Sequence, residues 1–199
     1  ASITGGIMTG SGSTILASGG SHSLSGAYQY LRSGRTLRND GQLVVGSTTN
    51  DVKLYMDGSN GGTAKTRLVN QGEMVFQGAR NTYIYQGSGN PDAELENNGK
   101  LIKRDSGYAA VSTRVANSGQ LIVDGGVLNV SGKLTNHGDI HVQQGQLSYT
   151  GGAWNAPLQN DGKIVIDSGA RLSLGSNASL VNNGRLMGNG SLELLNANL

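Results

Sequence analysis

The chain alternates short runs, in which every second residue is apolar, with bends rich in glycine and asparagine. Leu121 and Val123 precede the pair Gly125–Gly126, and Leu128 and Val130 follow it. The same order, two alternating runs on either side of a glycine, follows Gly138 and Gly162. Alternation at period two predicts β-strands with one face turned inward. We therefore expect two short strands in each copy, joined by a glycine turn that needs positive φ.

A short phrase recurs along the chain: an aliphatic residue, any residue, Asn, any residue, Gly, any residue and a second aliphatic residue. The gaps between successive Asn residues of this phrase are 31, 27, 20, 19, 24 and 22 positions. Self-similarity at such a period predicts a solenoid. The Asn residues are Asn39, Asn70, Asn97, Asn117, Asn136, Asn160 and Asn182.

Stacked coils explain both the strands and the asparagines. Strands this short expose unpaired backbone on both edges, so they need parallel partners in the coils above and below. A polar side chain at a bend between inward aliphatics is costly unless it is paired. We therefore predict an all-β parallel solenoid in which the Asn side chains bond to one another from coil to coil. A sandwich or propeller is the alternative, but both normally use antiparallel hairpins and longer repeats.

The stretch LENNGKLIKRDSGYAAVSTRVANSGQLIVDGGVLNVSG, residues 95–132, resembles repeats of large bacterial surface and secreted adhesins. Filamentous-haemagglutinin-like proteins and autotransporter passenger domains are the families in question, and the likeness spans residues 37–199. The resemblance implies a right-handed β-helix with inner aliphatic ladders, placed extracellularly or on the bacterial cell surface. It carries over no catalytic residue and no receptor.

We expect a single β-helix domain over residues 1–199, in three parts. Residues 1–36 are irregular coils or a cap, 37–110 are coils with longer loops, and 111–199 are regular coils. Lys103 falls where the alternation predicts an inward aliphatic. The start at Ala1 and the strand-like Leu192–Leu195 at the end suggest a segment of a longer parent chain.

Composition narrows the function classes. The chain has no Cys, which excludes disulfides and cysteine metal sites. Its net charge of +2, without a basic stripe, argues against nucleic-acid binding. No apolar run reaches the roughly 18–20 residues that span a bilayer, so we expect no membrane insertion by this segment. No dinucleotide or calcium-binding motif is present, and we expect no cofactor.

Aromatic residues concentrate in the N-terminal half, where the period is longest. Tyr28/Tyr30 and Tyr83/Tyr85 are spaced by two, so each pair can show both rings on one strand face. Insertions into solenoids gather on one face, and that face often binds ligands. We therefore predict recognition by the insertions 46–67 and 78–94, although the plainer role for the rings is to fill wider coils or to cover an exposed flank. The candidate ligand-binding residues are Tyr55, Asp57, Arg80, Tyr83 and Tyr85.

Other clusters give weaker signals. Stacked coils could bring together two basic groups, Arg32/Arg35/Arg38 and Lys100/Lys103/Arg104, and so favour an acidic polysaccharide. Scattered solubilising charges are the more usual explanation of such residues. The series His137, Asp139 and His141 has metal-ligand chemistry but no evident fourth ligand, and Gly138 breaks its shared face, so we predict no metal. Most aspartates lie beside Gly, Asn or Ser and suit turns, so no catalytic residue is assigned.

The expected function is adhesion or ligand display by a rigid scaffold that engages a glycan or protein on a host or neighbouring cell. The alternatives are a carbohydrate-binding module, a polysaccharide-degrading β-helix of the lyase or tailspike kind, and a stalk without a ligand.

Overall fold

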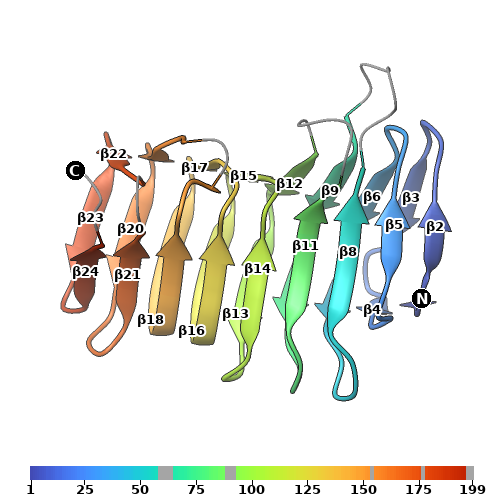
Figure 1. The fold of residues 1–199 in the computed structure, drawn as a ribbon, viewed down its shortest axis with the longest axis horizontal. Coiled ribbons are helices and arrows are strands. Elements are labelled where there is room, and N and C mark those ends of the chain that lie inside the picture. Colours follow the sequence, from blue (N-terminus) through green and yellow to red (C-terminus); the bar gives the residue numbers. More distant parts are fainter. Residues whose placement is uncertain (58–64, 88–92, 153–154, 176–177, 196–199) are drawn as a thin grey trace.

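The computed structural model describes residues 1–57, 65–87, 93–152, 155–175 and 178–195. These residues form a long stack of parallel strands, with the two ends of the chain at opposite ends of the stack (Figure 1). One sheet contains eight strands, one from each turn, so the chain makes about eight turns. The predicted all-β parallel solenoid is confirmed.

Three stacks of strands run along the solenoid. The first stack holds β1 (Ser2–Ile3), β4 (Ser21–Leu24), β7 (Gln42–Val45), β10 (Glu73–Phe76), β13 (Lys100–Arg104), β20 (Lys163–Ile166) and β23 (Arg185–Gly188). The second stack holds β2 (Gly6–Met8), β5 (Gln29–Leu31), β8 (Val52–Met56), β11 (Thr82–Gln86), β14 (Tyr108–Val111), β21 (Arg171–Leu174) and β24 (Ser191–Leu194). The third stack holds β3 (Ser13–Leu16), β6 (Thr36–Asn39), β9 (Arg67–Asn70), β12 (Glu94–Asn97), β15 (Arg114–Asn117), β17 (Leu134–Asn136), β19 (Leu158–Asn160) and β22 (Leu180–Asn182).

Two long strands, β16 (Gln120–Val130) and β18 (Asp139–Tyr149), each pass through both the first and the second stack. A turn therefore has three strand segments rather than the two expected from the sequence. The third segment carries the first half of the Asn phrase, and the phrase bends at its glycine into the first stack of the next turn. Three sides enclose one narrow interior.

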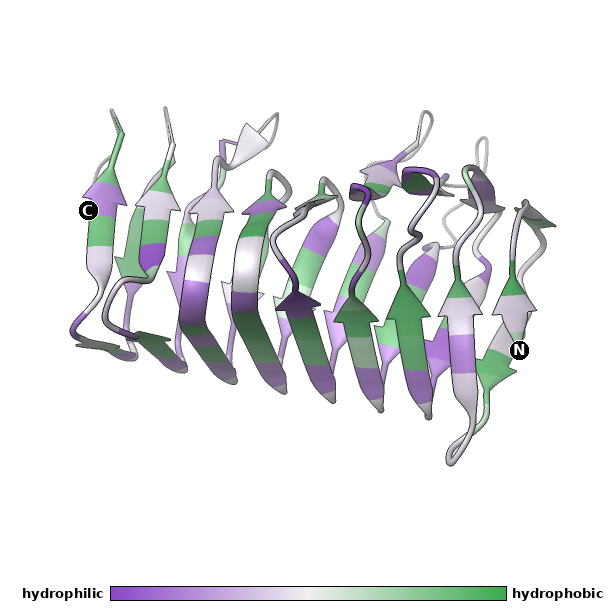
Figure 2. Cartoon of the chain, turned by 90° about the horizontal axis from the view of Figure 1, so that it is seen from below, coloured by the Kyte–Doolittle hydropathy of each residue, from purple (hydrophilic) through white to green (hydrophobic). Residues whose placement is uncertain are grey.

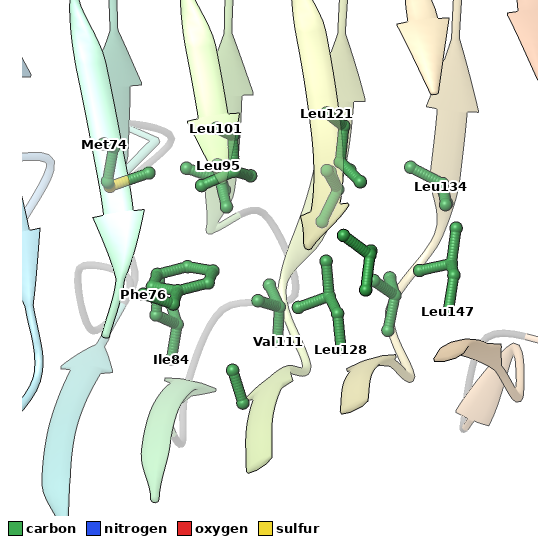
Figure 3. Packing of buried hydrophobic residues seen from close by; sticks show 14 of the residues in the cluster. Met74, Phe76, Ile84, Leu95, Leu101, Val111, Leu121, Leu128, Leu134 and Leu147 are labelled. Atoms are coloured by element: carbon green, nitrogen blue, oxygen red, sulfur yellow. The ribbon is translucent and has the colours of Figure 1, made fainter. Parts of the chain in front are cut away.

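The interior is filled by alternate residues of every side. Leu95, Leu121 and Leu128 are at most 1% exposed, and their side chains point into the interior beside those of neighbouring turns (Figure 3). Apolar bands recur at matching levels on neighbouring strands (Figure 2). Since burial of a Leu, Ile or Val side chain contributes roughly 1.5–3 kcal/mol, this continuous column of apolar residues is the main source of stability.

The asparagine ladder forms as predicted. Each Nδ2 donates to the Oδ1 of the next phrase Asn, at 2.8 Å from Asn39 to Asn70 and at 2.6 Å from Asn117 to Asn136. The backbone oxygen of each Asn also accepts from two amides of the next bend, as Asn70 does from Asn98 and Gly99. The side chains from Asn39 to Asn160 are fully buried and fix the register of turn upon turn.

The glycine of the phrase is required by close packing between turns. None of its copies has positive φ; instead, a Cβ on Gly99 would lie 2.1 Å from the carbonyl oxygen of Gly72 in the preceding turn. The same clash recurs at Gly119, 2.1 Å from the carbonyl oxygen of Gly99. Close approach of stacked bends selects these glycines. Positive φ does occur at the glycines between the first and second stacks, such as Gly126 with φ 58°.

Lys103 points inward, as its place in the alternation indicated. It stands in register with Phe76 and Val123, and its side chain is 3% exposed. Its Nζ donates to the backbone oxygens of Arg104 and Asp105, at 2.5 and 2.9 Å. Burial lowers the pKa of Lys103, although the nearby Asp105 carboxylate acts in the opposite direction. Lys103 is therefore a costly polar group in the interior.

Candidate functional site

Six of the seven tyrosines lie on the outer face of the second stack. Alternation along β8 turns Val52, Leu54 and Met56 inward, so Lys53 and Tyr55 point outward. The neighbouring strands repeat this arrangement because parallel pairing keeps them in register. Tyr30 of β5 pairs with Tyr55, and Tyr55 pairs with Tyr85 of β11. Three outward rings thus stand in one row across three turns.

The rings contact one another along and across the strands. Tyr55 lies between Tyr30 and Tyr85, with centroid distances of 5.2 Å on each side. Tyr83 and Tyr85 on one strand are nearly parallel, at 8° and 5.2 Å, which confirms that this pair shares one face. Tyr108 of β14 extends the cluster, 6.1 Å from Tyr83 and tilted by 57°. We call Tyr28, Tyr30, Tyr55, Tyr83, Tyr85 and Tyr108 the tyrosine face; it holds six of the seven tyrosines of the chain.

The geometry leaves parts of the rings open to a ligand. Rings in direct face-to-face contact approach to about 3.5–4.0 Å, so centroids at 5.2 Å belong to offset rings that cover each other only in part. Tyr28 is 54% exposed, and the others are partly exposed. Burial raises the pKa of Tyr85 and of Tyr108, so both phenols keep their O–H donors to a higher pH than an exposed tyrosine does. The face offers ring edges, ring surfaces and hydroxyl groups together.

One edge of the tyrosine face is closed by an ion pair. Nε of Arg32 lies 2.5 Å from Oδ2 of Asp57, and the guanidinium carbon lies 4.2 Å from the centroid of Tyr30. The Asp57 carboxylate, predicted from the sequence to contact a ligand, is thus already paired. Its direct role at this edge is to hold Arg32 against the rings.

The opposite edge opens into a depression of about 350 Å³, which we call the Tyr28 depression. It brings Tyr28 and Lys53 together with Asp51 and Arg80. The Lys53 ammonium lies 5.1 Å from the centroid of Tyr28, and its pKa is raised chiefly by that phenol. Charged groups of both signs therefore adjoin the most exposed ring.

The candidate residues from the sequence divide into three places. Tyr55, Tyr83 and Tyr85 form the centre of the tyrosine face, on strands rather than in loops. Arg80 lines the Tyr28 depression, and Asp57 lies at the other edge. The parts of the insertions at 58–64 and 88–92 lie outside the described residues. Sequence reasoning missed Lys53 as a partner of Tyr28; the register of turns of unequal length is needed to bring them together.

Most of the basic residues that were candidates for an acidic-polysaccharide surface are paired with other side chains or buried. Arg38 forms an ion pair with Asp40 at 2.6 Å, Lys100 lies 3.9 Å from Glu73, and Arg35 donates to Thr14. Lys103 is buried in the interior. These residues do not form an open basic surface.

The histidines do not converge on one point. His137 lies 3.4 Å from Asp161, whereas His141 lies 2.9 Å from Asp167. Hydrogen bonds from Asn183 and Gln159 lower the pKa of Asp161, which keeps that carboxylate charged. No group of three or more metal-ligating side chains occurs in the part of the chain that the structure describes.

Comparison of the chain with protein-family models, with curated proteins and with solved structures finds no match. Among the described residues, no helix has the length and apolar character needed to cross a bilayer. The functional argument therefore rests on the geometry of the solenoid and its outer face.

Proposed function

We propose that this chain is a rigid segment of a bacterial surface or secreted adhesin, and that its tyrosine face binds a glycan on a host or neighbouring cell. The observation that carries the proposal is the gathering of six tyrosines on one outer face. A role in the core would turn these rings inward, as it does Tyr149, which is fully buried. Exposed aromatic rings beside polar groups suit sugars, whose C–H faces pack on rings while their hydroxyls find hydrogen-bond partners.

The solenoid supplies rigid presentation. The strands that bear the tyrosines are paired on both sides and hold the rings at fixed spacing, so little entropy is lost when a ligand binds. Copies of the chain displayed together on a cell add avidity to weak single contacts. Under this proposal the parent chain acts outside the cell, and the segment works by binding without chemical turnover.

The test is a glycan array probed with the purified chain, followed by titration of each bound glycan. The triple variant Tyr55→Ala/Tyr83→Ala/Tyr85→Ala is expected to weaken binding by about tenfold or more, a loss of about 1.4 kcal/mol for each factor of ten. A matched variant, Ile122→Ala/Val165→Ala, truncates outward side chains of the first stack and should bind like the unmodified chain.

The results separate the proposal from its alternatives. Binding that the tyrosine variant loses and the matched variant keeps supports a glycan-binding adhesin. Release of reducing ends from a bound glycan would instead establish a polysaccharide-degrading enzyme. Absence of binding across the array would reject the glycan and leave a stalk or a protein receptor.

A further inference from the structure

The Tyr28 depression differs in charge from the rest of the tyrosine face. Its lining holds the two cations Lys53 and Arg80 and the single carboxylate of Asp51. One oxygen of that carboxylate, Oδ1, accepts a hydrogen bond from the backbone amide of Asn81 at 3.2 Å. A net positive charge therefore lies beside the most exposed ring of the face.

Neither cation is neutralised by an ion pair with another described residue. The Lys53 ammonium contacts the Tyr28 ring, a contact that leaves its positive charge in place. The Arg80 side chain is exposed at the mouth of the depression. Elsewhere on the outer face, cations pair with carboxylates of the adjacent turn, as Lys163 does with Asp139 at 3.3 Å and Arg171 with Glu193 at 3.1 Å.

We propose that the Tyr28 depression is a subsite for a carboxylate-bearing sugar of the bound glycan, with Lys53 and Arg80 as its anion-binding groups. This inference rests on the proposed glycan-binding function and names the class of sugar. The sugar ring packs on Tyr28 while its carboxylate faces the two cations. The side-chain amide of Asn50 and the hydroxyl of Thr49 also line the depression, where they can form hydrogen bonds with the hydroxyls of the sugar.

A carboxylated sugar fits this site better than a nucleic acid does. Nucleic-acid binding draws on a row of cations that follows a phosphate backbone. Here two cations converge on one hollow, and the Arg32 guanidinium at the opposite edge is paired with Asp57. One localised anion on a ring-shaped ligand matches this arrangement.

The experiment compares two forms of one ligand by calorimetric titration: an oligogalacturonate and the same oligomer with its carboxylates methyl-esterified. At low salt we expect the acid to bind at least about fivefold more tightly than the ester. This preference should shrink as added salt screens the charges. Hyaluronan oligomers and sialyl-lactose, tested in parallel, distinguish uronate from sialate sources of the carboxylate.

Variants locate the effect. Lys53→Gln and Arg80→Gln should each lower the acid-over-ester preference by about two- to fivefold, and the double variant should abolish it. Lys133→Gln and Arg185→Gln remove equivalent exposed charges in later turns and should leave the preference unchanged. Circular dichroism checks that every variant keeps the strand content of the unmodified chain.

Each outcome is decisive. Equal affinity for acid and ester, or a preference that survives the double variant, would overturn the subsite. If glycan binding still depended on Tyr55, Tyr83 and Tyr85 in that case, the proposed function would stand without the subsite. Absence of binding to every oligomer and every glycan on the array would reject both the subsite and the proposed function.

Discussion

Loss of one asparagine from the middle of the ladder should destabilise the solenoid strongly. The Oδ1 of Asn117 accepts from Asn97 at 2.6 Å, and its Nδ2 donates to Asn136 at 2.6 Å and to the backbone oxygen of Asp139 at 3.1 Å. Asn117→Ala leaves the Oδ1 of Asn136 without its donor and removes the closest acceptor of Asn97. An unsatisfied buried polar group costs about 1–3 kcal/mol, and the vacated volume adds to that. We expect the free energy of unfolding to fall by about 2–4 kcal/mol.

The end of the ladder provides an internal comparison. Leu16 occupies the register position before Asn39, and the Oδ1 of Asn39 has no hydrogen-bond partner among the described residues. Asn39→Ala therefore breaks one bond between asparagines, whereas Asn117→Ala breaks two. The cost at Asn39 should be smaller by about 1 kcal/mol. Asn98 is an exposed neighbour of the ladder, and Asn98→Ala should change stability by less than about 0.5 kcal/mol.

Equilibrium unfolding in urea, followed by far-ultraviolet circular dichroism, measures all three variants. The slope m should stay the same, since each variant exposes the same surface on unfolding, and only the midpoint should move. A midpoint for Asn117→Ala that matched those of Asn98→Ala and the unmodified chain would refute a stabilising ladder. Equal losses of stability for Asn39→Ala and Asn117→Ala would show that the cost does not follow the number of broken hydrogen bonds, although the ladder would still be stabilising.

Three further predictions concern single positions. Gly119→Ala places a Cβ 2.1 Å from the Gly99 carbonyl oxygen and should cost about 1–3 kcal/mol in urea unfolding, whereas Gly5→Ala, where the nearest atom is 3.6 Å away, should cost much less. Lys103→Met should stabilise the chain by about 1–3 kcal/mol at neutral pH. Because the pKa of Lys103 is lowered in the folded chain, the unfolded chain binds more protons between that lowered pKa and 10.5. The unmodified chain therefore gains stability as pH rises through this window, and the stability advantage of Lys103→Met shrinks. Urea unfolding at neutral and at alkaline pH measures this difference. Burial raises the pKa of Tyr149 to about 12 from 10.0. Its contribution to the free energy of unfolding is therefore complete below pH 10.0, and about 3 kcal/mol of stability is lost as pH rises towards 12. Ultraviolet titration should show this late ionisation, and Tyr149→Phe should remove both the late ionisation and the hydrogen bond to Ala156.

The inner structure was predictable because its cause is local and repeated. The alternation of Leu121 with Val123 places both inward, and the fixed distance from each aliphatic to its Asn puts the amide into the bend. The third strand of each turn was missed because the phrase spans a bend, so one motif belongs to two strands. The reason for Gly99 was missed because the clash comes from Gly72 in another turn, 27 positions earlier.

The outer face was predictable only along single strands. The spacing of Tyr83 and Tyr85 implies a shared face, and the structure confirms it. Contacts between turns depend on the length of each intervening loop, which alternation does not determine. Tyr30 meets Tyr55 across 25 positions, and Tyr55 meets Tyr85 across 30. The pairing of Arg32 with Asp57 and the approach of Lys53 to Tyr28 follow from the same register.

Inward residues of the strands must pack in the core, whereas outward residues face the surface and have no part in that packing. Leu54 and Ile84 continue the apolar column through the turns that bear the tyrosine face, so the longer loops leave the interior unbroken. Later turns have the same interior, but their outward positions carry ion pairs such as Lys163 with Asp139. Because alternation isolates the two sides, outward residues can change without a cost in the core. A solenoid of this kind can therefore vary its outward residues at a few turns, as the proposed binding surface requires, while the remaining turns supply length and rigidity.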